Sequence, residues 1–119
     1  NYSKIYFLPH QKFPEDLLQA CDTFCLPSHR EGFGISVIEA SSLEIPVICS
    51  DIYGLKETVI DGVTGLKHRV GDVEHIKEKL EFALSNKILM KRIGKNGRKY
   101  VEKEFSEKLM LKYWENFYI

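Results

Sequence analysis

Two glutamates eight positions apart, Glu31 and Glu39, flank a short turn that contains two glycines, Gly32 and Gly34. A carboxylate accepts hydrogen bonds from two hydroxyl groups, so it suits the neighbouring hydroxyls of a ribose or a hexose. A glycine has no Cβ, so the backbone can approach a ligand closely and can adopt a positive φ where a turn requires it. The spacing therefore predicts one carboxylate contact on each side of a turn whose backbone a ligand can approach.

The turn between the glutamates is expected to join a buried strand to a helix. Residues 23–26 form an apolar run that Pro27 ends, and the residues from Gly34 onward have helical character. A helix that begins there leaves its first backbone N–H groups unpaired and directs the positive end of its dipole beyond the strand. Such a helix start is an anion site, and open parallel sheets bind their ligands at this end of the strands.

Further motifs follow this turn along nearly the whole chain. The segments that carry them are residues 27–40, 45–48, 54–57, 61–66, 94–98 and 105–106. With its Glu-x7-Glu spacing and Gly-Phe-Gly insert, the chain resembles the C-terminal, donor-binding half of the retaining group 1 glycosyltransferases of the GT-B fold. The resemblance implies an α/β fold, in which a Rossmann-like parallel sheet has flanking helices and a helical C-terminal end, truncated at its N-terminus.

The same resemblance implies a role for each residue of the turn. Glu31 is expected to be the catalytic residue, which lies against the donor hexose and holds its hydroxyls or stabilises developing positive charge. Glu39 is expected to bind the ribose. The backbone of Gly32, Phe33, Gly34 and Ile35 is expected to meet the hexose hydroxyls and the phosphates. Apart from the resemblance, Arg30 directly precedes Glu31 and is a further candidate for a substrate contact.

The implied reaction moves a hexose from a nucleotide diphosphate-sugar donor to a hydroxyl of a saccharide or lipid-linked acceptor. It retains the anomeric configuration and needs no metal or other cofactor. Among the remaining polar residues, His10, His68 and His75 lack the spacing of a metal site and are interpreted as structural or surface residues.

Each glutamate also has an ordinary structural explanation when it is taken alone. A helical wheel places Val37, Ile38, Ser41 and Ile45 in one stripe and leaves Glu39 on the far side, where any surface glutamate lies. Glu31 would be favoured near a helix start by the dipole even without a ligand. Only the combination of strand, glycine turn, spacing and a second apolar strand favours a ligand site.

Several other classes of protein share parts of this sequence pattern. A dinucleotide-dependent oxidoreductase shares the strand, turn and helix, but it requires a small third residue where Val37 stands. The chain has neither a nucleophile-elbow serine nor a Gly-x-x-x-x-Gly-Lys motif, which argues against a serine hydrolase of that type and against a P-loop protein. Two alternatives stay open: a non-catalytic sugar-nucleotide-binding or partner subunit, and a nucleotide-sugar epimerase on the same fold.

Length and composition indicate a single domain over residues 1–119, and the cysteine content indicates a protein of a reducing compartment. Seventeen basic and seventeen acidic residues balance, so no overall charge attracts nucleic acid. The three cysteines are odd in number and lack redox or zinc spacing, which indicates packed thiols in a cytoplasmic protein. No apolar run is long enough to cross a bilayer, and the sequence shows no signal-peptide pattern, so a soluble chain is expected.

Apolar runs without polar alternation predict a parallel sheet with right-handed crossovers, covered on both faces. The predicted strands are residues 5–8, 23–26, 46–50 and 65–68. The predicted helices are residues 14–20, the segment from Gly34 onward, residues 55–60, a helix capped by Asp72, residues 87–104, and a last helix capped by Ser106. The helix after Asp72 is expected to bury Val73, Ile76, Leu80 and Leu84.

The abrupt start at Asn1 suggests a piece of a longer protein. The resemblance implies that an N-terminal acceptor domain is missing, together with a basic pair that neutralises the leaving diphosphate. Without those positive charges the leaving group is poorly stabilised, so the chain alone is expected to transfer no sugar.

A local excess of positive charge lies near the C-terminus. Residues 87–112 contain nine Lys or Arg residues and three Glu. Two interpretations remain: a solvated outer face of amphipathic helices, or a peripheral contact with anionic lipid at the inner face of the membrane, where an acceptor would reside.

Overall fold

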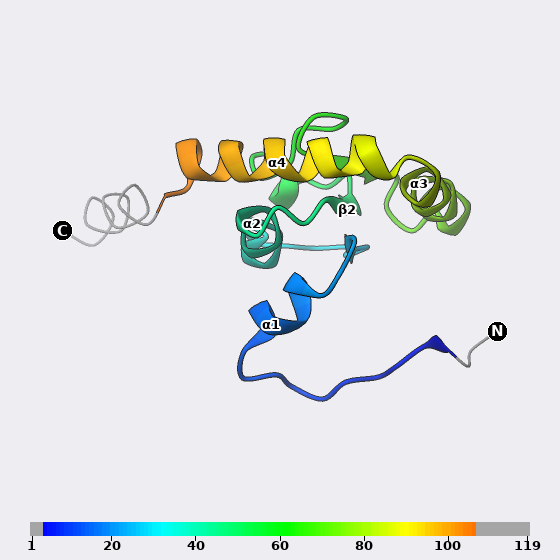
Figure 1. The fold of residues 1–119 in the computed structure, drawn as a ribbon. Coiled ribbons are helices and arrows are strands. Elements are labelled where there is room, and N and C mark those ends of the chain that lie inside the picture. The colour runs from blue at the N-terminus through cyan, green and yellow to red at the C-terminus, as the bar shows by residue number, and fades with distance from the viewer. Residues whose placement is uncertain (1–3, 107–119) are drawn as a thin grey trace.

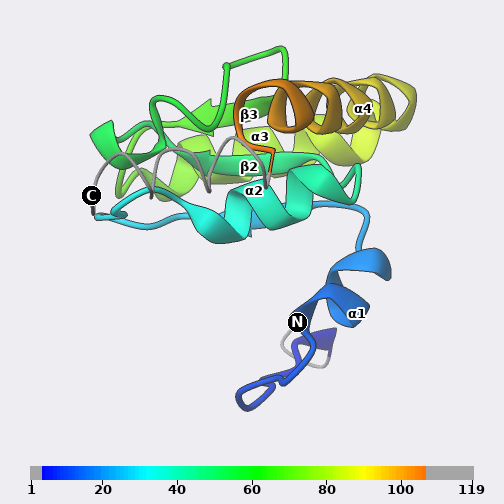
Figure 2. The same ribbon diagram turned by 90° about the vertical axis from the view of Figure 1, so that its left-hand side faces the viewer.

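The sheet at the centre of the structure has three parallel strands. The computed structural model describes residues 4–106, and within them β1 (Phe24–Leu26), β2 (Val47–Ser50) and β3 (Gly65–His68) lie in the order β1-β2-β3. Helices lie on both sides of this sheet (Figure 1, Figure 2). The parallel arrangement and three of the four predicted strands are therefore confirmed, each to within a residue at either end.

The central strand is buried on both of its faces, as expected for a strand inside a parallel sheet. All four residues of β2 are buried, because its continuous apolar run has side chains that suit both sides. Val47 and Cys49 belong to a core cluster with α2 (Ile35–Ser42), while Ile48 belongs to a second cluster with α4 (Lys87–Glu104). The sheet thus separates two apolar cores.

The helices follow the sequence signals at most positions. Proline occupies the first turn of α1, as expected for a helix start. In α2 the predicted stripe is confirmed, since Val37 and Ser41 are buried and Ile38 is partly buried. The bounds of the remaining helices are α1 Pro14–Gln19, the 3-10 turn η2 Tyr53–Leu55 and α3 Val73–Ser85.

The longest helix, α4, matches its predicted bounds of residues 87–104. Ile93 and Val101 are buried as predicted, and Leu89 and Tyr100 are partly buried. Gly94 lies so close to the segment after α2 that a Cβ would overlap the carbonyl oxygen of Glu44. The absence of a side chain at this position lets the helix lie directly against the end of α2.

The predicted strand at residues 5–8 is wrong. This segment has no strand structure, and Phe7 is 94% exposed. A strand needs a neighbour to which its N–H and C=O groups can bond, and the described residues supply none beside it. Apolar content alone therefore overstated the tendency of this segment to form a strand.

The predicted helix at residues 55–60 is also wrong. The chain makes only the short turn η2 and then a hydrogen-bonded loop. The backbone N–H of Ile60 donates to the hydroxyl of Thr64 at 2.8 Å, and the carbonyl of Ile60 accepts from the N–H groups of Val63 and Thr64. These loop bonds replace the bonds that a continued helix would make.

The core spacing predicted for α3 is wrong as well. Val73 and Leu84 are each 72% exposed, Leu80 is 38% exposed and Ile76 is only partly buried. Ala83 is the one residue of this helix that is buried. The helix packs mainly against the edge strand β3, so a single narrow side faces the core. The predicted last helix lies outside the described residues.

Candidate functional site

The loops that follow the three strands meet at one edge of the sheet, because parallel strands end on the same side. A Cβ on Gly54, in the loop after β2, would overlap the carbonyl oxygen of Glu31, in the loop after β1. A Cβ on Gly71, after β3, would lie 3.5 Å from Cε1 of His29. The first loop is therefore in contact with both of the others.

Gly34 forms the start of α2, as the sequence predicts. It is the N-cap residue and has a left-handed backbone with φ of 74°, which favours glycine. A Cβ there would also overlap the side chain of Leu55. No side chain caps the helix, and Ile35 at its first position is 64% exposed. The helix start therefore keeps the amide donors that an anion would bind.

Glu31 lies directly before this helix start and is held by a neighbouring hydroxyl. Ser28 Oγ donates to Glu31 Oε1 at 2.7 Å, and the pair is partly buried. Sequence reasoning missed Ser28, although its position three residues before the glutamate was visible. The bond orients one carboxylate oxygen and leaves the other free to accept a hydroxyl hydrogen bond.

Glu39 and Arg30 are both exposed. Glu39 lies four residues after Ile35 on α2, so the two side chains share the exposed side of the helix. Its backbone carbonyl accepts from Ser42 Oγ at 2.7 Å, while the described residues make no bond to its carboxylate. The structure therefore places Glu31, the glycine turn and Ile35 together, with Glu39 one helical turn further along.

Phe33 has a structural contact that the sequence did not suggest. Its ring packs edge to face on Phe105, 5.4 Å between centroids, and Phe105 packs on Tyr100 in the same way at 5.8 Å. The Tyr100 hydroxyl donates to the carbonyl of Glu57 at 2.5 Å. Burial, followed by the charges of Glu104 and Glu57, raises the pKa of Tyr100, so this donor stays protonated at neutral pH. The end of α4 thus holds two of the site loops.

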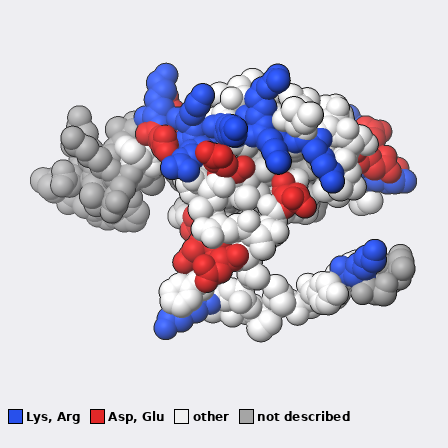
Figure 3. All heavy atoms as spheres, viewed as in Figure 1, with Lys and Arg blue, Asp and Glu red and all other residues white. Residues whose placement is uncertain are grey.

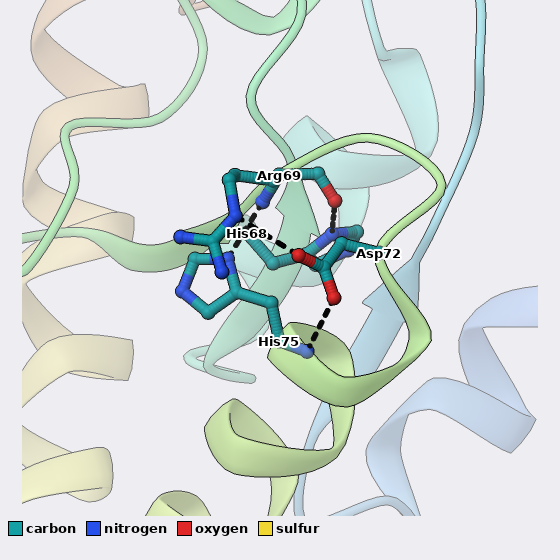
Figure 4. Close-up of polar contacts among 4 residues, drawn as sticks. All are labelled: His68, Arg69, Asp72 and His75. Carbon is teal, nitrogen blue, oxygen red and sulfur yellow. Dashed lines mark hydrogen bonds and ion pairs between the residues drawn. The ribbon is translucent and has the colours of Figure 1, made fainter.

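A compact set of polar contacts fixes the loop after β3 (Figure 4). Asp72 Oδ1 accepts from the backbone N–H of His75 at 3.0 Å, which confirms the predicted cap of α3, and its Oδ2 accepts from Arg69 Nε at 2.9 Å. The same two partners, the His75 amide first, lower the pKa of Asp72. The backbone N–H of Arg69 donates to His75 Nδ1 at 2.8 Å, so this nitrogen carries no proton.

One pair of buried polar atoms near this loop lacks partners. Ser50 and His68 are paired in register at the ends of β2 and β3, and both are buried. His68 Nδ1 lies 3.0 Å from the carbonyl oxygen of Arg69, whereas His68 Nε2 and Ser50 Oγ make no hydrogen bond within residues 4–106. Within the same part of the chain, no three His, Cys, Asp or Glu side chains are grouped as metal ligands.

The three cysteines differ in burial, and burial shifts the pKa of two of them. Burial raises the pKa of Cys49 to about 12 and also raises that of Cys25. Cys21, by contrast, is exposed beyond the end of α1, so the prediction of a packed thiol is wrong there. Its Sγ lies 3.2 Å from the carbonyl oxygen of Leu17.

We expect iodoacetamide to alkylate Cys21 in the native chain and Cys49 only after unfolding, because the thiolate is the nucleophile. Between the ordinary pKa of 9.0 and about 12, native Cys49 keeps a proton that the unfolded chain releases. The free energy of unfolding should therefore fall as pH rises through this range. Mass spectrometry of the labelled chain and denaturant titrations at several pH values measure both effects. Rapid labelling of native Cys49 would contradict the prediction.

Comparison with known proteins places the chain in a family. Residues 2–100 match the model of the family described as "Glycosyl transferases group 1". The capsular polysaccharide biosynthesis glycosyltransferase CapM of Staphylococcus aureus is 38% identical over 114 residues, which are 96% of this chain and 30% of that protein. The chain thus spans about a third or less of the relatives it matches.

Two further similarities concern acceptors and structure. A Campylobacter jejuni enzyme, named N,N'-diacetylbacillosaminyl-diphospho-undecaprenol alpha-1,3-N-acetylgalactosaminyltransferase, is 31% identical over 82% of this chain and 26% of its own length. A solved structure of an S. aureus TarM mutant contains fondaparinux, alpha-GlcNAc-glycerol and UDP. It matches 97% of this chain and 24% of the TarM chain, with a TM-score of 0.87 and 25% identity.

The parallel sheet with its flanking helices is the Rossmann-like half of a GT-B fold, as the resemblance implied. The family model covers most of the chain, including the glycine turn and the two glutamates that flank it. This chain belongs to the group 1 glycosyltransferases.

Proposed function

We propose that the chain is the donor-binding, C-terminal domain of a retaining hexosyltransferase, folded as one domain over residues 1–119. The observation that carries the proposal is the turn at the carboxyl edge of the sheet, where Ser28 orients Glu31 and α2 begins without a side-chain cap. The family match supports the reaction class. UDP in the TarM structure supports a uridine nucleotide as the first donor to test.

Each residue of the turn has a place in the proposed donor complex. Glu31 meets the hexose hydroxyls or the positive charge that develops at the reacting carbon. The amides of Gly34 and Ile35 bind the diphosphate at the positive end of the helix dipole. Glu39, one turn further along the exposed side of α2, binds the ribose diol. The backbone of Gly32 and Phe33 and the side chain of Arg30 complete the contacts.

The remainder of the enzyme is proposed to supply the acceptor domain. The chain covers only 30% of CapM, so most of a transferase of that size lies in other segments. We further propose that these segments carry the basic pair for the leaving diphosphate, and that the chain alone is inactive. The name of CapM supports a role in polysaccharide biosynthesis, and that of the C. jejuni relative supports a saccharide acceptor on a lipid carrier.

We further propose that the protein is cytoplasmic and makes a peripheral contact with the inner face of the membrane. The free cysteines support a reducing compartment. None of the described helices is long and apolar enough to span a bilayer. In this proposal a peripheral contact with the membrane surface brings the bound donor to a lipid-linked acceptor.

Calorimetric titration of the chain with UDP-, GDP- and ADP-sugars tests the donor. We expect one nucleotide class to bind and no sugar to be transferred. Glu39→Ala should weaken binding at least about tenfold, since a hydrogen bond to a charged group contributes about 1.5–3 kcal/mol. The unfolding midpoint should not change, because Glu39 is exposed. Turnover by the isolated chain would contradict its inactivity, and failure of the complete protein to bind any of the three donors would contradict the proposed function.

A further inference from the structure

The outer face of α4 is basic, and most of its basic side chains make no ion pair within the described residues. This helix has seven Lys or Arg residues and two Glu. Both glutamates lie close to basic residues of the last turns, since Arg98 pairs with Glu102 and Lys103 lies 4.0 Å from Glu104. Five exposed basic side chains make no ion pair within the described part of the chain: Lys87, Lys91, Arg92, Lys95 and Lys99. Figure 3 shows the basic side chains gathered along this helix.

An exposed isoleucine lies at the N-terminal end of this basic face. Ile88 is 83% exposed, although it is one of the most apolar side chains. At 100° per residue, Ile88, Arg92, Lys95 and Lys99 form a stripe roughly 60° wide. The buried residues of the helix lie on the opposite side: Met90, Ile93, Gly94, Gly97 and Val101. The exposed face is therefore amphipathic, with an apolar side chain in its first turn next to Lys87, Lys91 and Arg92.

We propose that the outer face of α4, from Lys87 to Lys99, binds the surface of an anionic phospholipid bilayer, with Ile88 inserted among the lipids. Charge complementarity favours an anionic partner, and the unpaired cations need not break internal ion pairs to meet it. Nucleic acid would satisfy the cations but would leave Ile88 in water. A bilayer interface accepts both, because the apolar side chain enters the acyl boundary while lysine stems extend to the headgroups.

The proposed contact would also orient the donor site. The end of α4 contacts the glycine turn through Phe105 and Phe33, and the loop after η2 through Tyr100. A bound α4 would therefore hold these loops at a fixed height above the membrane. The binding itself does not depend on the transfer reaction, so it can be tested even if the proposed donor is wrong.

Co-sedimentation of the chain with phosphatidylcholine vesicles, with and without phosphatidylglycerol, tests this proposal. We expect pelleting only with the anionic lipid, and less of it at high salt. Lys95→Glu with Lys99→Glu should weaken binding more than about tenfold, because each basic residue near an anionic surface contributes about fivefold. Ile88→Ser should weaken it about tenfold through the lost apolar insertion.

The matched control is Val73→Ser, which removes a similarly exposed apolar side chain, 72% exposed, at the far end of α3. It should leave vesicle binding unchanged. Circular dichroism establishes that all variants are folded. Absence of pelleting at low salt would overturn the proposal. The proposal would also be overturned if Ile88→Ser left vesicle binding unaltered and duplex RNA competed with the vesicles for the chain. Charge alone would then explain the binding.

Discussion

Replacing Glu31 with glutamine in the complete enzyme is expected to lower the rate of sugar transfer by about 10²–10³-fold, the usual loss when one group that stabilises the transition state is removed. Glutamine keeps the size of the side chain and can still accept from Ser28 Oγ, which bonds Glu31 Oε1 at 2.7 Å. It loses the negative charge that would stabilise a positive reacting carbon. Steady-state kinetics with saturating donor should show a lower kcat and a KM that changes little.

Two further variants separate chemistry from general damage. Glu81→Gln changes an exposed carboxylate on α3, far along the sequence from the turn, and should leave kcat unchanged. Ser28→Ala removes the bond that orients Glu31 and should give a loss smaller than that of Glu31→Gln. An unaltered kcat in Glu31→Gln would show that this carboxylate takes no part in transfer. Donor binding without any transfer by the complete protein would favour the non-catalytic alternative.

Replacing Gly54 with alanine is expected to lower the free energy of unfolding by about 1–3 kcal/mol, the usual cost of overfilling a close contact. A Cβ at this position would overlap the backbone carbonyl of Glu31. Backbone atoms cannot rotate away as a flexible side chain does, so the two loops must separate. Denaturant titration of the chain measures the change as a lower midpoint at constant slope.

Gly32→Ala is the matched control for this substitution. Gly32 lies in the loop that Gly54 contacts, but a Cβ there would meet nothing within 4 Å. Its unfolding free energy should stay within about 0.5 kcal/mol of the original. If Gly32 also faces the donor, as proposed, the new methyl group should weaken donor binding without weakening the fold. Equal midpoints for the Gly54→Ala and Gly32→Ala variants would contradict the close contact between the loops.

The elements that sequence predicted correctly depend mainly on local pattern. β2 has an uninterrupted apolar run, and α4 repeats its apolar residues at helical spacing, so both were recognised with nearly correct bounds. Gly34 as the start of α2 was recognised in the same way, from the change of pattern after a glycine turn. The predictions for residues 5–8, for residues 55–60 and for the burial of α3 are wrong because tertiary contacts, or the lack of them, outweigh the local pattern there.

The sequence by itself determined the order of strands and helices, the glycine turn and the spacing of Glu31 and Glu39, because each depends on residues close together in the chain. Only the tertiary structure decided what surrounds Glu31. Its carbonyl lies against Gly54, and the neighbouring Phe33 packs on Phe105, 72 positions further along the chain. Such contacts exist only once the strands have paired and α4 has packed on α2, so no local pattern of residues encodes them.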